Sequence, residues 1–119
     1  MRVLVCGSRH FHDYEKLKEE LLKLHTPDGH KVDCIISGHA KGADSLGERF
    51  AEEYNIPCEI YPADWDKYGK AAGLIRNAQM LKEGKVGLVL AFLAPESRGT
   101  KNMIEQSIKV KKPVKVVNI

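Results

Sequence analysis

The chain has 119 residues, of which 43% are hydrophobic and 29% are charged, and its formal net charge at pH 7 is only +3. This composition is that of an ordinary globular protein with one core, so we expect a single domain spanning residues 1–119. The small net charge, with no lysine or arginine run longer than Lys111-Lys112, argues against a nucleic-acid groove or a membrane-binding surface.

The three cysteines, Cys6, Cys34 and Cys58, each lie in or beside an apolar run. This setting favours buried, reduced thiols and a cytoplasmic protein. No cysteine or histidine pair has the spacing of metal ligands, so we expect no metal and no cofactor. The chain opens on a strand with no leader before it, and its longest apolar run, 86–94, is too short to cross a bilayer.

The chain begins with a strand and a helix. Val-Leu-Val-Cys at 3–6 is a continuous apolar run, typical of a central parallel strand covered on both faces. Asp13 is the expected N-cap of a first helix, which must stop at the breaker cluster 26–29. The apolar residues of that helix are Leu17, Leu21, Leu22 and Leu24.

The stretch 34–54 predicts a strand, a glycine loop and a helix. An apolar run at 34–37 indicates a buried strand, Gly38 and Gly42 bracket a tight loop, and a helix over 43–54 follows. A strand that turns over glycines into a helix presents free backbone N–H groups at the positive end of the helix dipole, which favours an anion such as phosphate. The alternative is a plain strand-to-helix turn.

The second half of the chain continues the alternation. The expected strands are 58–61, 86–93 and 114–117, and the expected helices are 71–82 and 100–110. Residues 62–73 form the least regular segment. Four residues of the 71–82 helix should face inward: Leu74, Ile75, Ala78 and Leu81.

Strands that alternate with helices predict an α/β sandwich of three layers with five parallel strands. We expect the strand order 3-2-1-4-5, because the long connection after the third strand would then cross the sheet. Ligands bind where the winding reverses, outside the carboxyl ends of the first and fourth strands. Three polar loops that contain glycine, 7–9, 38–44 and 98–100, would meet there.

The ligand-binding candidates in these loops are Gly7, Ser8, Arg9, Gly38, Lys41, Gly42, Asp44, Arg98, Gly99 and Thr100. Arg9 either holds a phosphate bidentately or pairs with a neighbouring acid. Asp44 either accepts from a ribose hydroxyl or stabilises the start of its helix. Thr100 is the expected N-cap of the last helix, a role that would occupy its hydroxyl group and compete with ligand binding.

Five candidates lie outside the loops: Asp64, Trp65, Arg76, Asn77 and Glu105. Trp65 either stacks on a base or covers the core, and the Arg76-Asn77 pair faces either the crevice or solvent. Glu105, or else Asp64, would serve as the catalytic acid or base if the chain is an enzyme, although Glu105 is also an ordinary helix residue. Neither a Gly-x-Gly-x-x-Gly fingerprint after the first strand nor a Walker lysine motif is present.

Five ordered motifs together resemble the YspA-type branch of the SLOG superfamily, small proteins frequent in bacterial and phage genomes. They are Val-Cys-Gly-Ser-Arg-His-Phe at 5–11, Ser-Gly-His-Ala-Lys-Gly-Ala-Asp at 37–44, Pro-Ala-Asp-Trp at 62–65, Ala-Gly-Leu-Ile-Arg-Asn-Ala-Gln-Met at 72–80 and Arg-Gly-Thr at 98–100. The resemblance covers nearly the whole chain. It implies a Rossmann-like domain, a small-molecule nucleotide ligand, and assembly as a homodimer or larger. Adjacent Met80 and Leu81 also offer one apolar position more than a single core-facing stripe requires.

The superfamily includes the Lonely Guy phosphoribohydrolases, which remove the base from nucleoside monophosphates, and the DNA-processing protein DprA. The Lonely Guy motif is Pro-Gly-Gly-x-Gly-Thr with a glutamate three residues on, whereas here Glu96 and Ser97 replace the glycine pair and Met103 replaces the glutamate. Asn77 stands where their Arg-Lys motif has lysine. The departures favour a nucleotide-binding sensor or carrier. The alternative is an N-glycosidic hydrolase, and a DNA-binding module is disfavoured by the near-neutral charge.

Overall fold

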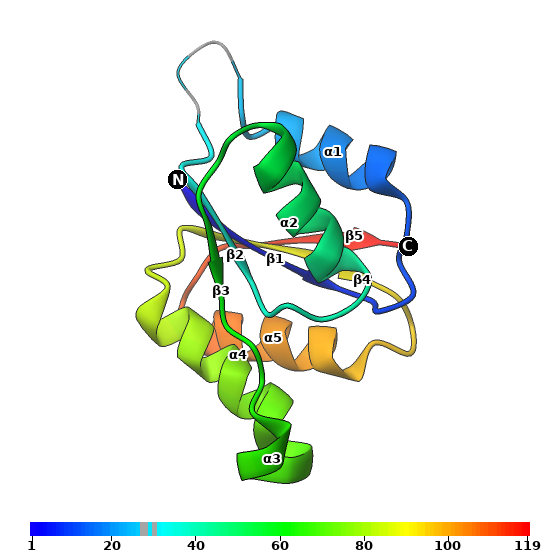
Figure 1. The fold of residues 1–119 in the computed structure, drawn as a ribbon, viewed down its shortest axis with the longest axis vertical. Helices are drawn as coiled ribbons and strands as arrows, with labels where there is room; N and C mark the ends of the chain where they lie inside the picture. The colour runs from blue at the N-terminus through cyan, green and yellow to red at the C-terminus, as the bar shows by residue number, and fades with distance from the viewer. Residues whose placement is uncertain (27–28, 30) are drawn as a thin grey trace.

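The computed structural model describes residues 1–26, 29 and 31–119. Five parallel strands form one sheet in the order β3-β2-β1-β4-β5 (Figure 1). The strands are β1 (Arg2–Gly7), β2 (Cys34–Ser37), β3 (Cys58–Ile60), β4 (Leu88–Leu93) and β5 (Val114–Asn118). The predicted strand order is therefore confirmed, and β1 and β4 are neighbours, with Leu4 beside Val89.

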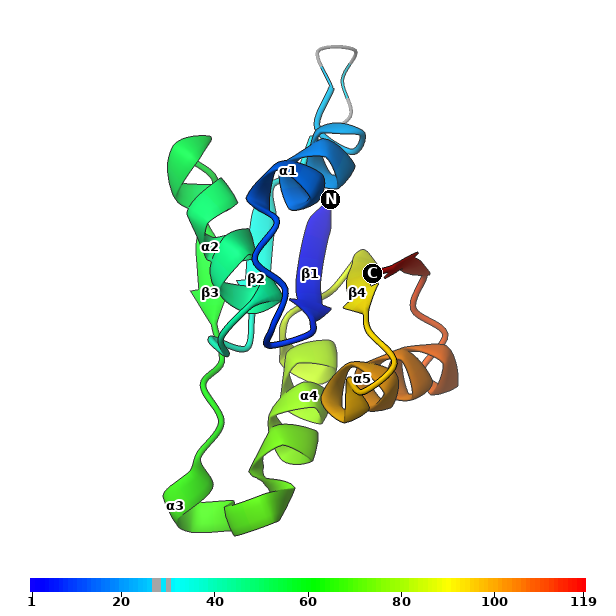
Figure 2. The same cartoon turned by 90° about the vertical axis from the view of Figure 1, so that its right-hand side faces the viewer.

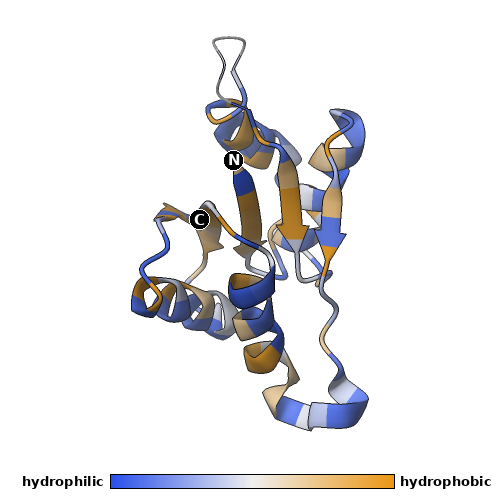
Figure 3. Cartoon of the chain, turned by 90° about the vertical axis from the view of Figure 1, so that its left-hand side faces the viewer, coloured by the Kyte–Doolittle hydropathy of each residue, from blue (hydrophilic) through white to orange (hydrophobic). Residues whose placement is uncertain are grey.

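Helices cover both faces of the sheet and complete a Rossmann-like α/β sandwich. α1 (Tyr14–Leu22) and α2 (Ala43–Glu53) lie on one face, and α4 (Ala72–Glu83) and α5 (Arg98–Lys109) lie on the other (Figures 1 and 2). Each face of the sheet has its own hydrophobic core, and strand β1 contributes side chains to both, because successive side chains of a strand point to opposite faces. Val3 and Val5 pack under α1 and α2, while Leu4 and Cys6 pack under α4 and α5. The central strands are accordingly among the most hydrophobic segments (Figure 3).

Helix α1 begins as predicted, because the Asp13 carboxylate accepts a hydrogen bond from the Lys16 N–H at 3.1 Å. Leu17 and Leu21 are fully buried, and the helix ends at Leu22. Two residues of the predicted breaker cluster, Pro27 and Asp28, lie outside the described residues.

The segment that the sequence predicts to be irregular contains two short helices. α3 (Trp65–Tyr68) and η1 (Gly69–Ala71) project beyond the sheet, and we call residues 61–71 the arm (Figures 1 and 2). Asp64 caps α3, since its carboxylate accepts from the Lys67 N–H at 3.1 Å. Periodicity could not reveal a helix of four residues, because one turn is too short for an apolar face to repeat.

Three of the four residues expected to face inward on α4 do not. Leu74 is 49% exposed and Ile75 is 40% exposed, and Ala78 is exposed as well, while only Leu81 is buried as predicted. The first half of α4 runs beside the arm, past the edge of the sheet, so no strand covers its apolar side chains (Figure 2). The buried face of α4 instead consists of Ala72, Asn77, Met80 and Leu81.

Two further predictions need correction. Cys6 and Cys34 are buried as expected, but Cys58 is exposed, because β3 is a short strand at the edge of the sheet. The last helix begins at Arg98, so Ser97 occupies the N-cap position and Thr100 is the third residue of the helix.

In the part of the chain that the structure describes, no helix is long and apolar enough to cross a membrane.

Candidate functional site

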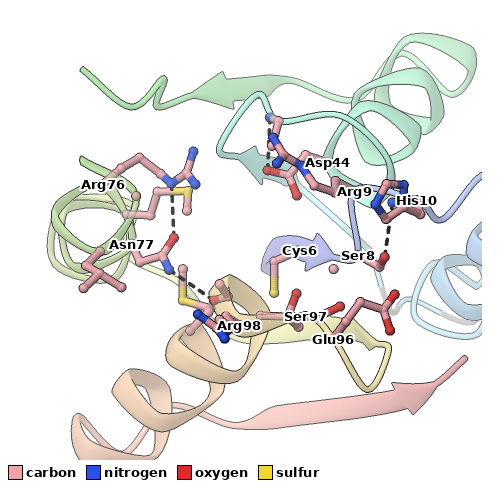
Figure 4. A pocket seen from close by; sticks show the side chains of 18 of the residues that line it. Cys6, Ser8, Arg9, His10, Asp44, Arg76, Asn77, Glu96, Ser97 and Arg98 are labelled. Carbon is pink, nitrogen blue, oxygen red and sulfur yellow. Dashed lines mark hydrogen bonds between the residues drawn. The ribbon is translucent and has the colours of Figure 1, made fainter. Parts of the chain in front are cut away.

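A pocket of about 430 Å³ opens at the carboxyl ends of β1 and β4, where the winding of the sheet reverses (Figure 4). Cys6, near the end of β1, lines its centre. The walls come from the loop after β1, the start of α2, one side of α4 and the first turn of α5. Ligands of doubly wound sheets bind in this position, and the volume lies within the range of about 300–1,000 Å³ that is typical of small-molecule sites.

Most of the candidates from the sequence meet in this pocket. Its lining includes Gly7, Ser8, Arg9, Asp44, Trp65, Arg76, Asn77, Arg98, Gly99 and Thr100. Five candidates lie outside the lining: Gly38, Lys41, Gly42, Asp64 and Glu105. Glu105 is exposed on α5 and Asp64 is exposed at the start of α3, so the fold brings neither of the predicted catalytic acids to the pocket.

Sequence reasoning missed several lining residues, including Cys6, His10, Lys70, Glu96, Ser97 and Met103. Cys6 and Met103 carry no signal of their own, since an apolar residue near the end of a strand or inside a helix is indistinguishable from core. His10 and Ser97 are direct neighbours of chosen residues and Glu96 is two positions from Arg98, so a selection extended by two residues on each side of the loops includes all three. Lys70 lies on the arm, whose helices were not predicted.

The first turn of α5 has unused hydrogen-bond donors. The Ser97 hydroxyl accepts from the Ala94 N–H at 3.3 Å and does not cap α5. Among the described residues, the backbone N–H groups of Gly99 and Thr100 have no acceptor. Thr100 is 5% exposed, and its hydroxyl is not used for capping. Free N–H groups at the positive end of a helix of 12 residues therefore line the pocket.

Several cationic side chains line the same pocket. Arg9 and Arg98 are exposed at the rim, and Arg76 reaches in from α4. His10 and Lys70 also line the pocket, whereas its acids are Asp44 and Glu96. Figure 4 shows Arg76 and His10 at opposite ends of the pocket. The excess of cationic groups over carboxylates favours an anionic ligand.

Asn77 connects Arg76 to the first turn of α5. Its Oδ1 accepts from Arg76 Nε at 3.1 Å, and its Nδ2 donates to Asn102 Oδ1 at 3.1 Å and to the Gly99 carbonyl at 3.4 Å. Arg76 also donates from Nη1 to the Gly38 carbonyl at 2.5 Å. The Arg76-Asn77 pair thus faces the pocket rather than solvent, and it links the loop after β2 to α5.

The loop after β2, in contrast, satisfies many of its own groups. The Ala43 N–H donates to the Ser8 carbonyl at 3.2 Å, and the Ala40 N–H donates to Asp44 Oδ2 at 3.3 Å. The Ser37 hydroxyl donates to Glu48 Oε2 at 2.7 Å, and the same oxygen lies 3.0 Å from Nδ1 of the His39 ring. These bonds fix the loop against α2 and against the end of β1.

Gly42 is required by this packing. Its φ of +81° is a conformation that residues with side chains rarely adopt, and a Cβ atom at this position would lie 2.2 Å from the Ser8 carbonyl oxygen. The backbone of Ser8 and Arg9 therefore fills the space next to Gly42 in which the sequence predicts a phosphate.

Two buried groups in the pocket have altered acidity. Burial raises the pKa of the Asp44 carboxyl to about 6, although the Ala40 N–H and the charge of Arg76 oppose this shift. Burial also raises the pKa of the Cys6 thiol, so this sulfur stays protonated at neutral pH. Within the described residues, no group of three or more histidine, cysteine or acidic side chains could hold a metal ion.

The fold and the pocket define a Rossmann-like α/β domain with a cation-lined site where the winding of its sheet reverses. Residues 1–68 match the family described as YAcAr: YspA, cpYpsA-related SLOG family. The chain is 35% identical over 122 residues to the Gene 61 protein of Mycobacterium phage D29, across 95% of this chain and 93% of that protein. No solved structure matches the chain significantly.

The chain therefore belongs to the YspA, cpYpsA-related SLOG family, which confirms the resemblance found in its motifs. Membership of this family suggests a nucleotide-related ligand.

Proposed function

We propose that this protein binds a phosphorylated nucleoside in the pocket and acts as a sensor or carrier of that nucleotide. The observation that carries the proposal is the pair of free N–H groups, on Gly99 and Thr100, at the start of α5 in a pocket rich in cations. A phosphate is the ligand that such a helix terminus accommodates best.

The phosphate would accept from these two N–H groups and from the guanidinium groups of Arg9 and Arg98, which line the same pocket. The Ser8 hydroxyl accepts from the His10 N–H at 3.1 Å and, among the described residues, has no acceptor for its own hydrogen. It can therefore donate to a phosphate oxygen as well. Contacts of this charge-assisted kind are roughly twice as strong as those between neutral groups.

The base would lie toward the arm. Trp65 lines the pocket while 59% exposed, so its ring is accessible for stacking. The tip of its indole ring packs over Gly73 of α4, 3.6 Å from where a Cβ atom would lie. Stacking of a base on an aromatic side chain contributes about 1–3 kcal/mol and tolerates any base.

Binding rather than hydrolysis is supported by the positions of the acids. The Lonely Guy hydrolases carry a glutamate three residues after their Gly-Thr pair, where this chain has Met103. The two acids proposed instead, Glu105 and Asp64, lie outside the pocket, whose lining acids are Asp44 and Glu96. We therefore expect at most slow release of base from a nucleoside monophosphate.

The experiment is calorimetry with AMP, GMP, CMP, UMP and inorganic phosphate. At least one nucleotide should bind, and Arg9→Ala should weaken its binding by about 1.5–3 kcal/mol, or roughly 10- to 150-fold. Arg49→Ala is the matched control, because Arg49 stacks on Tyr14 of α1 and does not line the pocket. Binding of none of the five ligands at millimolar concentration would refute the proposal. Base release faster than about 1 per second, an ordinary enzyme rate, would replace the sensor with a hydrolase.

We also propose that the protein forms a homodimer or a larger assembly. Met80 and Leu81 are buried in the core, so they do not provide the surplus apolar surface that the sequence suggests. Exposed apolar side chains cluster instead on the arm and the start of α4: Trp65, Tyr68, Leu74 and Ile75. Sedimentation at high micromolar concentration should give a dimer or larger species, and Leu74→Glu should shift it toward monomer. A monomeric parent protein would contradict this proposal.

A further inference from the structure

Asp44 is a buried carboxylate on the wall of the pocket that faces the first turn of α5 (Figure 4). It is the second residue of α2 and is only 5% exposed. Asp44 therefore faces the pocket from the side opposite to the free N–H groups of Gly99 and Thr100.

The protein leaves this carboxylate poorly satisfied. The Ala40 N–H donates to one oxygen at 3.3 Å, a long hydrogen bond, and the backbone of Gly38 makes a weaker contact that also lowers the pKa of the group. No side chain donates to either oxygen among the described residues. No lysine, arginine or histidine of the described part forms a salt bridge with it. The positive charge of Arg76 lowers the pKa of Asp44, but the Arg76 side chain already donates to Gly38 and Asn77.

Burying a carboxylate with so few donors is costly, and burial is the largest cause of the rise in the pKa of Asp44 to about 6. At pH 7 the group is nevertheless mostly ionised, and an ionised carboxylate only accepts hydrogen bonds. The missing partners are therefore hydrogen-bond donors, and they must enter through the pocket.

The spacing of the two walls indicates which donors these are. Asp44 follows β2 and the first turn of α5 follows β4, and β1 lies between these strands. Two interstrand spacings amount to about 10 Å. A phosphate held at α5 would place the sugar that carries it over the end of β1, where its ring hydroxyls can reach toward Asp44. One carboxylate can accept hydrogen bonds from two vicinal hydroxyls at the same time.

We propose that Asp44 recognises the ribose hydroxyls of the bound nucleotide, so that the pocket selects ribonucleotides over deoxyribonucleotides. This inference rests on the proposed function, because it requires the phosphate to lie at α5. The competing role for Asp44 is a structural one, in which its carboxylate only closes the loop 38–44 through the Ala40 N–H.

The test compares each of AMP, GMP, CMP and UMP with its 2′-deoxy and 3′-deoxy counterparts by calorimetry on the unmodified protein. We expect removal of either hydroxyl to weaken binding of the preferred nucleotide by about 10-fold or more, the size of a hydrogen bond to a charged group. In Asp44→Asn, which keeps the shape and one acceptor oxygen, the ratio of ribo to deoxy affinity should fall to about 3-fold or less, as expected of a neutral partner.

Asp13→Asn is the matched control. It makes the same chemical change at the N-cap of α1, outside the pocket, and should leave the ratio unchanged. Equal binding of ribo and deoxy forms by the unmodified protein would overturn the inference while the proposed function stands. A ratio that persists in Asp44→Asn would assign the selectivity to another residue and overturn it as well. If no nucleotide binds, the proposed function fails and the inference fails with it.

Discussion

Two strand-to-helix junctions of this domain look alike in sequence and differ in what their backbone does. Each follows a parallel strand and has a glycine near the start of the next helix: Gly42 is the N-cap of α2, and Gly99 is the second residue of α5. At the junction after β2, the Ala43 and Ala40 N–H groups donate to Ser8 and Asp44 within the protein. At the junction after β4, the N–H groups of Gly99 and Thr100, in the first turn of α5, have no acceptor among the described residues.

The two glycines have correspondingly different roles. Gly42 is packed against the backbone of Ser8 and Arg9, whereas a Cβ atom on Gly99 would meet nothing within 4 Å. The loop after β2 is therefore part of the framework, and the first turn of α5 is part of the pocket. A glycine at the start of a helix thus marks either close packing within the protein or an opening for a ligand, and the hydrogen bonds of the surrounding backbone distinguish the two.

The largest expected effect comes from exchanging these glycines for alanine. Gly42→Ala should lower the free energy of unfolding by about 3 kcal/mol or more, because it combines a strained backbone with a clash. Gly99→Ala should raise the free energy of unfolding by about 0.5–1 kcal/mol, the gain in helix propensity. Urea denaturation of the two variants measures both values. A Gly42→Ala protein as stable as the parent would show that the loop after β2 is not part of the framework.

The next prediction concerns how two buried acids, Asp44 and Glu20, make the stability of the protein depend on pH. The pKa of Asp44 rises from 3.8 to about 6, so the folded state holds the proton more tightly than the unfolded state. Stability attributable to Asp44 therefore falls as pH rises from about 4 to 6, by about 3 kcal/mol at 1.36 kcal/mol per pKa unit. Arg76, Glu48 and the Cys6 thiol are the charged or titratable groups that interact with Asp44.

Asp44→Asn should accordingly stabilise the ligand-free protein at pH 8 by about 1–3 kcal/mol, less than the full shift because the amide is itself a buried polar group. The gain should vanish near pH 4.

Glu20 is the opposite case, because hydrogen bonds from Lys115 and Lys23 lower its pKa to about 2 against the effect of burial. Its contribution is present above about pH 4.5 and is lost as pH falls, so Glu20→Gln should destabilise the protein at pH 7. Thermal melts between pH 4 and 8 measure both variants; a destabilised Asp44→Asn at pH 8 would assign Asp44 to the framework.

The smallest effect concerns the Thr100 hydroxyl. Because Thr100 is the third residue of α5 and does not cap it, Thr100→Val should change the free energy of unfolding by less than about 0.5 kcal/mol. Nucleotide affinity should fall by about 1 kcal/mol, the value of one hydrogen bond. Calorimetry and melts on one preparation give both numbers. Loss of stability with retained affinity would mean that the hydroxyl serves the helix.

The sequence predicts the fold well because the fold follows from patterns that repeat along the chain. Alternating strands and helices, and the long connection between β3 and β4, determine the order of the sheet. It predicts the pocket in outline because Arg9, Asp44, Arg76 and Thr100 follow or face strand ends at one edge.

What the sequence does not reveal depends on contacts between distant segments. The exposure of Leu74 and Ile75 follows from α4 running past the sheet, and the N-cap of α5 lies three residues earlier than expected, at Ser97 rather than Thr100. Gly42 lies outside the pocket because of the backbone of Ser8 and Arg9, which are more than 30 residues earlier in the chain. No local pattern records such a contact.

The most direct test is a titration of ¹⁵N-labelled protein with the nucleoside monophosphate that binds most tightly in calorimetry, followed through the backbone amide resonances. We expect the Gly99 and Thr100 amides to shift most, since they would donate to the phosphate, and the Ala43 amide, which already donates to the Ser8 carbonyl, to change little. Saturable shifts centred on Gly42 and Ala43, with Gly99 and Thr100 unaffected, would place the phosphate at the loop after β2 and contradict the account.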